Sequence, residues 1–284
     1  MDGVLLVNKE RGLSSQAVLT KLKHILNEKK IGHCGTLDPM AEGVLVVLLG
    51  SATKLSSYLL EKDKEYIAEA LLGVETTTYD LEGEVIKKVD NPDVSLDKID
   101  EVLKSYQGTI MQTPPIYSAI KINGRKLYDY AIKGDEVELK PREVIIYEIR
   151  RLTDVIDNKF SFKVSASKGT YIRSLVHDIG ESLKTFATVA RLIRTRSGKF
   201  MISDAYSLND IENGNYKLIK MSDAIDLEKI TINKDLFKKV SFGGKISLKD
   251  IKASQNEVAL IYNGELVAIY KREDSFYKAV RVWN

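Results

Sequence analysis

Short apolar runs separated by polar turns organise the chain and predict its elements. Val4–Val7 has the pattern of a short buried strand, and residues 43–50 form a continuous apolar run of strand length, typical of a strand buried on both faces. Between them, Ser14 or Ser15 caps a helix with apolar residues at helical spacing. A second helix is expected over residues 51–63, opening on Ser51.

The middle of the chain continues with strands and helices in irregular order. Residues 64–74 alternate like a strand, residues 95–108 form a helix capped by Ser95, and residues 167–183 hold a turn and an amphipathic helix. Further strands are expected over residues 144–152, 159–166 and 190–200. This order lacks clean βαβ units, so we predict an α+β fold with a mixed, largely antiparallel sheet flanked by helices.

Two segments stand apart from this pattern. Residues 117–140 are basic and aromatic and contain an Asn123-Gly124 turn, which predicts a hairpin insertion. Near the C-terminus, the strands 257–262 and 265–271 are separated by a second Asn-Gly turn. We therefore expect a catalytic domain over residues 1–230 and a small β-rich module over residues 231–284.

Composition sets broad limits on the class of protein. The 284 residues are 44% hydrophobic and 29% charged, which suits one large and one small globular domain. Forty-three basic and 40 acidic side chains give a net charge of +3, which neither requires nor excludes a polyanionic partner. One cysteine cannot form an internal disulfide, and the first apolar run is too short to cross a membrane. A soluble cytoplasmic protein is expected.

The usual signatures of metal and nucleotide sites are missing from the sequence. Its three histidines are scattered, it has no C-x-x-C pair, and it has neither a Walker loop nor a G-x-G-x-x-G motif. We expect no metal and no cofactor. His33 and Cys34 are adjacent, and adjacent side chains in an extended loop point apart, so Cys34 is better explained as a small packing residue than as a nucleophile.

The segment GHCGTLDPMAEG, residues 32–43, holds the most informative acidic residue. Asp38 precedes a proline, so its carboxylate could cap a turn by accepting backbone N–H bonds. It could equally be a functional carboxylate, because the three glycines around it let a ligand approach the backbone closely. Spacing alone leaves both interpretations open.

Basic residues recur beside aromatic residues and glycines along the chain. Any one group could be a solvated charged face, but four such groups together favour phosphate contacts with stacking platforms, and hence RNA. The groups are Lys64 with Tyr66, Arg125 and Lys126 with Tyr128, Lys168 with Tyr171 and Arg173, and Arg191, Arg194 and Arg196 with Lys199.

Taken in order, six segments resemble the TruB-type tRNA pseudouridine synthases of bacteria, which isomerise the T-loop uridine at tRNA position 55. The G-H-x-G-x-L-D-P part of the second segment is the most specific. The segments are DGVLLVNKERGLSS, GHCGTLDPMAEGVLVVLLGSATK, KEYIAEALLG, PPIYSAIKINGRKLYDYAIKG, SKGTYIRSLVHDIGE and RLIRTRSGKF. The chain departs from the family pattern at Glu10, Cys34, Glu42 and Ile193.

The resemblance implies a role for several residues. Asp38 would be the catalytic aspartate, Tyr66 the aromatic ring that stacks on the target uracil, and Arg173 the partner of the aspartate. Leu192 would form an apolar wall of the base pocket, and His33 would fill the space that the T-loop base leaves. Contacts to RNA are expected from Lys9, Lys64, Lys121, Arg125, Lys126, Lys168, Tyr171, Arg194 and Arg196. Lys9 could instead buttress the loop.

The implied reaction is an isomerisation that needs no cofactor. The N1–C1′ bond breaks, the uracil turns while bound, and C5 joins C1′, so the base must first be flipped out of its stack. A carboxylate could attack the sugar or the base, or remove a sugar proton, and these routes stay open.

The resemblance also implies partners. It points to an isomerase that modifies tRNA through its T-arm, and to a monomer that needs no obligatory protein partner and no membrane. The C-terminal module resembles a reduced PUA-like domain, and the chain lacks the long lysine-rich tail of guide-RNA-dependent relatives. The alternative function is an RNA-binding or tRNA-folding protein in which catalysis is not essential.

Overall fold

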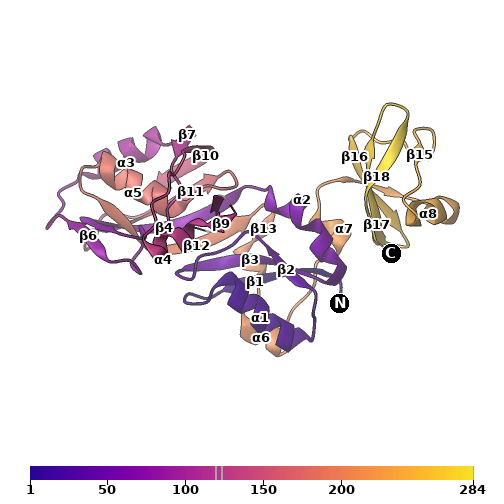
Figure 1. Ribbon diagram of the computed structural model, residues 1–284, viewed down its shortest axis with the longest axis horizontal. Helices are drawn as coiled ribbons and strands as arrows, with labels where there is room; N and C mark the ends of the chain where they lie inside the picture. The colour runs from indigo at the N-terminus through magenta and orange to yellow at the C-terminus, as the bar shows by residue number, and fades with distance from the viewer. Residues whose placement is uncertain (119, 123, 284) are drawn as a thin grey trace.

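The computed structural model describes residues 1–118, 120–122 and 124–283, and for Lys126 the backbone only. The chain forms an elongated molecule with a large body and a smaller β-rich unit at one end (Figure 1). In the described part of the chain, no helix has both the length and the apolar character needed to span a bilayer. The expectation that Asn123 forms part of a turn lies outside the described residues.

A nine-stranded sheet forms the centre of the body. Neighbouring strands are antiparallel, except that β3 and β12 run parallel over Leu192–Arg194 of β12. This arrangement confirms the predicted α+β fold with a mixed, largely antiparallel sheet. Its strand path is β1 (Gly3–Lys9), β3 (Ala41–Leu49), β12 (Ala187–Ser197), β4 (Lys64–Leu72), β11 (Lys159–Ala166), β10 (Arg142–Arg151) and β7 (Gly108–Gln112), with β2 (Ile31–Cys34) beside β3 and β13 (Phe200–Met201) beside β12.

The sheet forks along one side of β3. Strand β1 pairs with β3 over residues 43–49, while the opposite side of β3 pairs first with β12, at residues 41–43, and then with β2, at residues 46–49. The segment 35–40 connects β2 to β3 and therefore lies where these two partners of β3 separate. This places Asp38 at the fork.

Helices cover the sheet where the sequence predicts amphipathic segments. Helix α3 (Leu96–Ser105) packs on β10, and α5 (Ile172–Ser182) packs on β12. Ser14 caps α1 by accepting a hydrogen bond from the Ala17 amide at 3.1 Å, which resolves the choice between Ser14 and Ser15. Ser95 caps α3 in the same way, as predicted. The other helices of the body are α1 (Ser15–Leu26), α6 (Leu208–Glu212), α7 (Met221–Ala224) and the 3-10 turn η2 (Ile202–Asp204).

The helix expected over residues 51–63 is confirmed only in part, because the helical segment is shorter, begins as a 3-10 turn and is not capped by Ser51. A 3-10 turn, η1 (Gly50–Leu55), is followed by one short helix, α2 (Ser56–Leu60). The Ser51 amide donates to the Asp2 carboxylate at 2.5 Å, and the Ser51 hydroxyl faces Met221 instead of capping a helix. A contact between distant parts of the chain has therefore replaced the expected local cap.

The continuous apolar runs in β1 and β3 are explained by burial on both faces. Leu45, Val47 and Leu49 of β3 belong to the core beneath α1 and α5, and Val44, Val46 and Leu48 belong to a second core on the other face. β1 alternates between the same two cores. The second core continues into the C-terminal unit through Ile261, Leu266 and Trp283.

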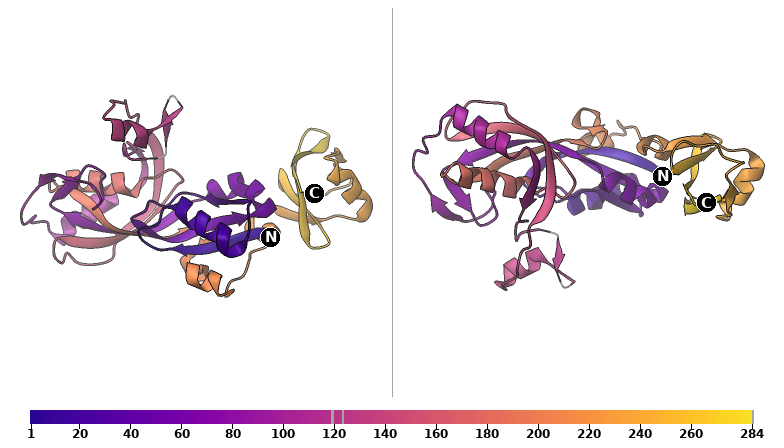
Figure 2. Two further views of the ribbon diagram at one scale, coloured as in Figure 1. Left: turned by 60° about the horizontal axis from the view of Figure 1, so that its bottom comes forward. Right: turned by 90° about the horizontal axis from the view of Figure 1, so that it is seen from above.

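Two small hairpins extend from the body. One is formed by β5 (Val74–Thr76) and β6 (Val85–Lys88), which the sequence pattern does not predict. The other lies in the expected insertion and consists of β8 (Lys121–Ile122) and β9 (Arg125–Lys126), followed by α4 (Leu127–Lys133). Figure 2 shows that this insertion projects well away from the body.

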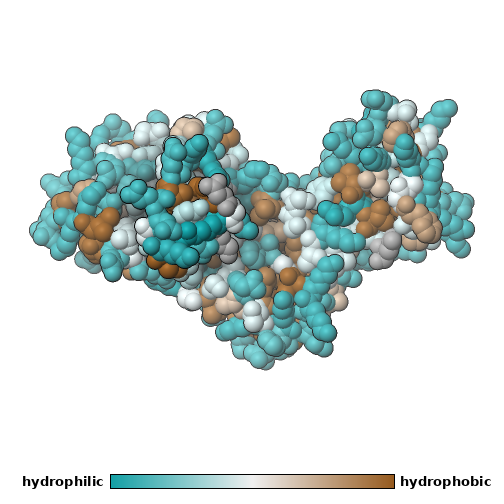
Figure 3. All heavy atoms as spheres, viewed as in Figure 1, coloured by the Kyte–Doolittle hydropathy of each residue, from teal (hydrophilic) through white to brown (hydrophobic). Residues whose placement is uncertain are grey.

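The C-terminal unit has its own five-stranded sheet and core. Its strands are β14 (Glu228–Thr231), β15 (Ile246–Ser247), β16 (Glu257–Tyr262), β17 (Glu265–Arg272) and β18 (Phe276–Val282), with helix α8 (Lys234–Ser241). The sheet starts at Glu228, slightly before the boundary expected at residue 231. A broad notch lies between this unit and the larger body, and its surface mixes hydrophilic, near-neutral and hydrophobic residues (Figure 3).

Trp283 joins the C-terminal unit to the body. Its indole Nε1 donates to the Ser51 carbonyl at 3.1 Å, and only 7% of the residue is exposed. We expect Trp283→Ala to destabilise the protein by about 3 kcal/mol, because the substitution removes a large buried side chain from a shared core. Urea unfolding measures the change, and Phe242→Ala, at a residue that is 91% exposed, is the control. If the two substitutions changed the free energy of unfolding equally, Trp283 would not stabilise the contact between the C-terminal unit and the body.

Candidate active site

The loop that carries Asp38 is held by a buried guanidinium. Arg194 of β12 is 1% exposed and donates from Nε to the Val44 carbonyl at 2.8 Å, from Nη1 to Thr36 at 3.3 Å and from Nη2 to Gly35 at 3.1 Å. A buried cation is tolerable only where oxygen atoms replace its water shell, and these three carbonyls do so. Arg194 therefore fixes both the start of the loop and the strand that follows it.

A glycine makes this close approach possible. Gly43 has a φ of +104°, and a Cβ at this position would lie 2.3 Å from the Arg194 carbonyl oxygen. Any side chain would separate β3 from β12 at the fork. In the structure, this glycine of the motif therefore serves the packing of the loop against β12.

The N-terminal segment holds the other side of the loop. The Ser15 hydroxyl accepts from the Leu37 amide at 2.8 Å and donates to its carbonyl at 3.0 Å. The Lys9 ammonium, 1% exposed, donates to the carbonyls of Leu13 at 2.6 Å, Glu10 at 2.9 Å and Pro39 at 3.3 Å. Residues on both sides of Asp38 are thereby fixed by groups from outside the loop.

Asp38 itself faces an arginine. Its side chain is 38% exposed, and its Oδ2 lies 2.9 Å from Nε of Arg173 on α5. This contact is an ion pair, and the hydrogen bonds of the guanidinium go to the carbonyls of Thr78 at 3.0 Å and Tyr117 at 2.8 Å. The expected pairing of Asp38 with Arg173 is therefore present as a contact in the structure.

A second carboxylate completes the surroundings of Arg173. Asp80 is 3% exposed and its Oδ2 lies 3.4 Å from Nη1 of Arg173. Its other oxygen accepts from the Thr78 hydroxyl at 2.5 Å and from the Glu82 amide at 3.0 Å. Arg173 thus lies between a buried carboxylate and an accessible one, and Asp38 is the one that a ligand can reach. Sequence reasoning missed Asp80, because no spacing links it to either partner.

The other expected site residues line the same region of the sheet. Tyr66 on β4 lies opposite Arg194 on β12, and Leu192 lies opposite Ala68, so the two side chains are diagonal neighbours on one face. Tyr66 is half-buried against the main core, and Leu192 is 5% exposed within it. Core packing, the alternative explanation for Leu192, therefore accounts for its position as well.

His33 lies on β2, beside Val47 of β3. The residue is half-buried, and its buried Nδ1 atom has no hydrogen-bond partner. Burial, and secondarily the charge of Arg194, lowers the pKa of His33, which favours the neutral ring. The neighbouring Cys34 is buried and burial raises the pKa of its thiol to about 11, which fits packing and not nucleophilic chemistry.

Comparison with known proteins identifies the family. A family model described as TruB family pseudouridylate synthase (N terminal domain) matches residues 23–172, which is more than half of the chain, and one described as tRNA pseudouridylate synthase B C-terminal domain matches residues 173–230. The chain belongs to the TruB family. The resemblance predicted from the sequence is thereby confirmed.

Curated relatives and solved structures agree with this family. The chain is 42% identical to tRNA pseudouridine synthase B of Bacillus pumilus, over 96% of this chain and 93% of the relative. It is 38% identical to the protein of the same name from Limosilactobacillus reuteri, over 100% of this chain and 99% of that relative. A chain in the crystal structure of a Cbf5-Nop10-Gar1 complex is 30% identical and superposes with a TM-score of 0.75, covering 99% of this chain and 84% of that one.

The basic residues of this TruB family member divide by exposure. Lys9 and Arg194 donate to carbonyl groups of the loop that carries Asp38. The Lys64 ammonium donates to two other carbonyl groups, that of Leu60, at 2.7 Å, and that of Lys62. Lys64 is 7% exposed. Burial lowers the pKa of Lys9 and of Lys64 to about 8. Their burial argues against the phosphate contacts expected of Lys9, Lys64 and Arg194. We assign Lys9 and Arg194 to the support of the loop at residues 35–40, and Lys64 to the support of the turn at residues 60–62.

The other expected RNA contacts lie closer to solvent. Lys121 on β8 and Lys168 are exposed, and Lys168 forms a surface ion pair with Glu61. Arg125 lies over the Tyr130 ring at 4.2 Å and pairs with Asp135 at 2.5 Å. The side chain of Lys126 lies outside the described residues.

Arg196 and Tyr171 are partly buried. Arg196 donates to Ser165 Oγ and to the Gly198 carbonyl, both at 3.0 Å. Tyr171 precedes α5 and exchanges two backbone hydrogen bonds with the Gln112 side chain, and burial raises the pKa of its hydroxyl.

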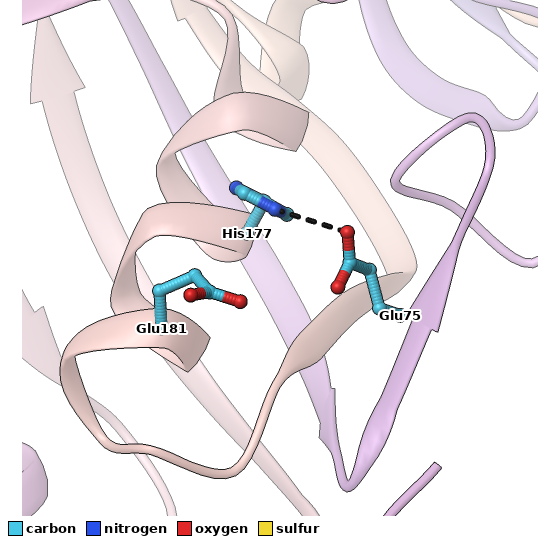
Figure 4. Close-up of side chains that lie close together, drawn as sticks. All are labelled: Glu75, His177 and Glu181. Carbon is cyan, nitrogen blue, oxygen red and sulfur yellow. Dashed lines mark ion pairs between the residues drawn. The ribbon is translucent and has the colours of Figure 1, made fainter. Parts of the chain in front are cut away.

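Among the described residues, one group has donor atoms close enough to hold a metal ion: Glu75, His177 and Glu181 (Figure 4). The ammonium group of Lys87 already lies beside the two carboxylates of this group. The Lys87 ammonium is 2.8 Å from Glu75 Oε2 and 4.0 Å from Glu181 Oε1. We assign no metal to this group.

Replacing the buried arginine tests the support of the loop. We expect Arg194→Met to reduce the free energy of unfolding by about 3 kcal/mol, since three carbonyls lose their donors at about 1 kcal/mol each. Arg191→Met is the matched control on the same strand, because its ion pair with Glu42 is exposed and should contribute less than about 1 kcal/mol. Urea unfolding of both variants gives the comparison, and a small loss in both would refute the role of Arg194.

The lowered pKa of Lys9 predicts a pH dependence of stability. Between pH 8 and its ordinary pKa of 10.5, Lys9 is protonated in the unfolded chain and increasingly neutral in the folded one. The unfolded state then binds more protons, so stability rises with pH in this window, by about 1 kcal/mol or more.

We expect Lys9→Met to reduce the increase of the free energy of unfolding with pH, because the part that comes from Lys9 is lost. Urea unfolding from pH 7 to 10 measures this increase. Lys23→Met, on the exposed face of α1, should leave the rise unchanged. An equal slope in the Lys9 variant and the native protein would count against the buried cation as its source.

Proposed function

We propose that this chain isomerises uridine 55 in the T-loop of tRNA to pseudouridine, without a cofactor. The observation that carries the proposal is the contact between Asp38 and Arg173 at the fork of the sheet, in a chain of the TruB family. Two relatives that match 96% and 100% of this chain are named tRNA pseudouridine synthase B. A fixed carboxylate that remains accessible is what the reaction requires.

Each step of the isomerisation has a group suited to it. The bond between N1 and C1′ breaks, the detached uracil turns, and a bond forms between C5 and C1′. The proton on C5 leaves to solvent and N1 gains one, so the overall composition is unchanged. Asp38 would act on the sugar or the base, as a nucleophile or as a base toward a sugar proton. Arg173 would orient the carboxylate throughout.

The base must leave the T-loop stack before it can react. Tyr66 offers an aromatic face for the flipped uracil, and Leu192 an apolar wall beside it. His33, which burial favours in its neutral form, would fill the space that the base leaves without adding a charge. The projecting insertion, residues 117–140, would clasp the T-arm through Lys121, Arg125 and Lys126, while Lys168, Tyr171 and Arg196 would contact the RNA nearer the site.

Domain roles and assembly complete the proposal. Residues 1–230 would form the catalytic domain, and residues 231–284 a PUA-like module that adds contacts to tRNA. The protein would act in the cytoplasm, as a monomer without an obligatory protein partner. Light scattering during size-exclusion chromatography, with and without tRNA, tests the monomer directly.

Tritium release from uridine C5 tests the reaction. An unmodified tRNA transcript labelled at C5 should release tritium with the native protein, and Asp38→Asn should lower kcat by about 10³-fold by removing the reactive carboxylate. Asp97→Asn, on the exposed face of α3, is the control. Primer extension after carbodiimide treatment would locate the product at position 55.

Filter binding separates the two candidate functions. If Asp38→Asn binds tRNA as tightly as the native protein but makes no pseudouridine, the carboxylate serves chemistry and not binding. No tritium release by the native protein, together with tight tRNA binding and faster tRNA refolding, would favour the tRNA-folding alternative.

A further inference from the structure

Helix α5 presents two residues to the same segment of the chain. Arg173 and His177 are one turn apart on α5, and both face the segment from Glu75 to Asp80. Arg173 reaches Thr78 and Asp80, while His177 Nε2 lies 3.3 Å from Glu75 Oε1 (Figure 4). The imidazole ring also packs on the Tyr79 ring, with 4.1 Å between the centroids and 31° between the planes.

The segment between these contacts has little freedom. Tyr79 has a φ of +62°, in the left-handed region that bulky residues rarely adopt, at a cost of about 1 kcal/mol. Its amide donates to Thr76 at 3.2 Å and its carbonyl accepts from Val189 at 3.0 Å. Tyr79 stands between Thr78 and Asp80, two of the residues that supply oxygens to Arg173. A shift of Tyr79 would therefore move the partners of Arg173.

Charges of both signs surround His177. Glu75 faces it from β5, Asp178 and Glu181 from its own helix, Tyr79 from the segment after β5, and Lys87 from β6 by way of Glu75. Three carboxylates and one ammonium leave an excess of negative charge that an imidazolium reduces. The hydrogen bond to Asp178 raises the pKa of His177, with Glu75 adding to the effect against the opposing effect of burial.

We propose that His177 is a positioning residue: its positive charge holds Glu75 and Tyr79 against α5, and so fixes the oxygens of Thr78 and Asp80 that orient Arg173 toward Asp38. This inference rests on the proposed function for its kinetic consequence. It predicts a reaction rate that depends on the protonation of a residue that touches neither RNA nor the reacting atoms. Nothing in the sequence pattern links His177 to Asp38.

The sign of the effect follows from the charge. His177 is an imidazolium at low pH and loses its proton as the pH rises above 6.5, its ordinary pKa, and through its raised value in the folded protein. The contacts to Glu75 and Asp178 then weaken. The contribution of His177 to the orientation of Arg173 is accordingly greatest at acidic pH and declines as the solution becomes alkaline.

The first experiment compares kcat for tritium release across pH 6 to 9 in three variants. The ratio of native to His177→Gln should be about fivefold at pH 6 and fall toward one at pH 9, with KM for tRNA unchanged within about twofold. Taking the ratio cancels the titration of other groups. His177→Arg keeps its charge, so its ratio to His177→Gln should stay constant with pH. His24→Gln, at an exposed histidine on α1, should match the native protein.

The second experiment needs neither activity nor RNA. Nuclear magnetic resonance of the intact protein follows the His177 ring and the Arg173 Nε–H through the same pH range. We expect both signals to titrate together, and the pKa of His177 to fall in Glu75→Gln. This outcome stands even if the native protein makes no pseudouridine, so failure of the proposed function is distinguishable from failure of this inference.

Two results would overturn the proposal. A ratio of native to His177→Gln that does not change with pH would mean that His177 only packs against Tyr79. An Arg173 signal that does not follow the His177 titration would mean that the segment 75–80 does not transmit the charge. Thermal unfolding of each variant at pH 6 ensures that the kinetics report on folded protein.

Discussion

The burial of the Arg194 guanidinium is the constraint on which the site depends. A cation without water must be surrounded by oxygen atoms, and here these are the carbonyls of Gly35, Thr36 and Val44. The loop can satisfy that demand in few conformations, since each carbonyl must point at one nitrogen. The need of the Arg194 guanidinium for oxygen partners thus fixes the backbone conformation of the loop, and this backbone carries Asp38.

Arg194 and Arg173 have different roles because their surroundings differ. Arg194 binds only backbone carbonyls and serves the architecture, whereas Arg173 joins backbone carbonyls to two carboxylates of unequal exposure. A planar guanidinium has donors enough to be held on several sides while one edge faces a reactive group. A lysine could not be fixed in this way, since its charge ends a flexible stem.

Local patterns in the sequence predicted much of the fold. The apolar run of residues 43–50 correctly indicated a strand buried on both faces, and Ser95 correctly marked the start of a helix. The helix expected over residues 51–63 is present only as a 3-10 turn and one short helix, and the cap expected of Ser51 was wrong because its partner, Asp2, is distant in sequence. The hairpin of β5 and β6 was missed, as its exposed second strand lacks an alternating pattern.

The site was less accessible to sequence reasoning than the fold. Family motifs indicated Asp38 and Arg173, and the structure places them in contact. Basic residues beside aromatic ones suggested RNA contacts, but a pattern of charges does not reveal whether a cation meets solvent or a buried carbonyl. Lys9, Lys64 and Arg194 turned out to do the latter. Asp80 and His177 act through segments that only the fold brings together.

The loop at the fork of the sheet is fully anchored by the protein itself. Serine, lysine and arginine side chains of the protein hold it from both flanks. The free energy that orders Asp38 therefore comes from folding and not from association with RNA. In the proposed reaction, the affinity of the protein for a T-arm would then be left for unstacking the uridine and turning it toward a carboxylate that is already in place.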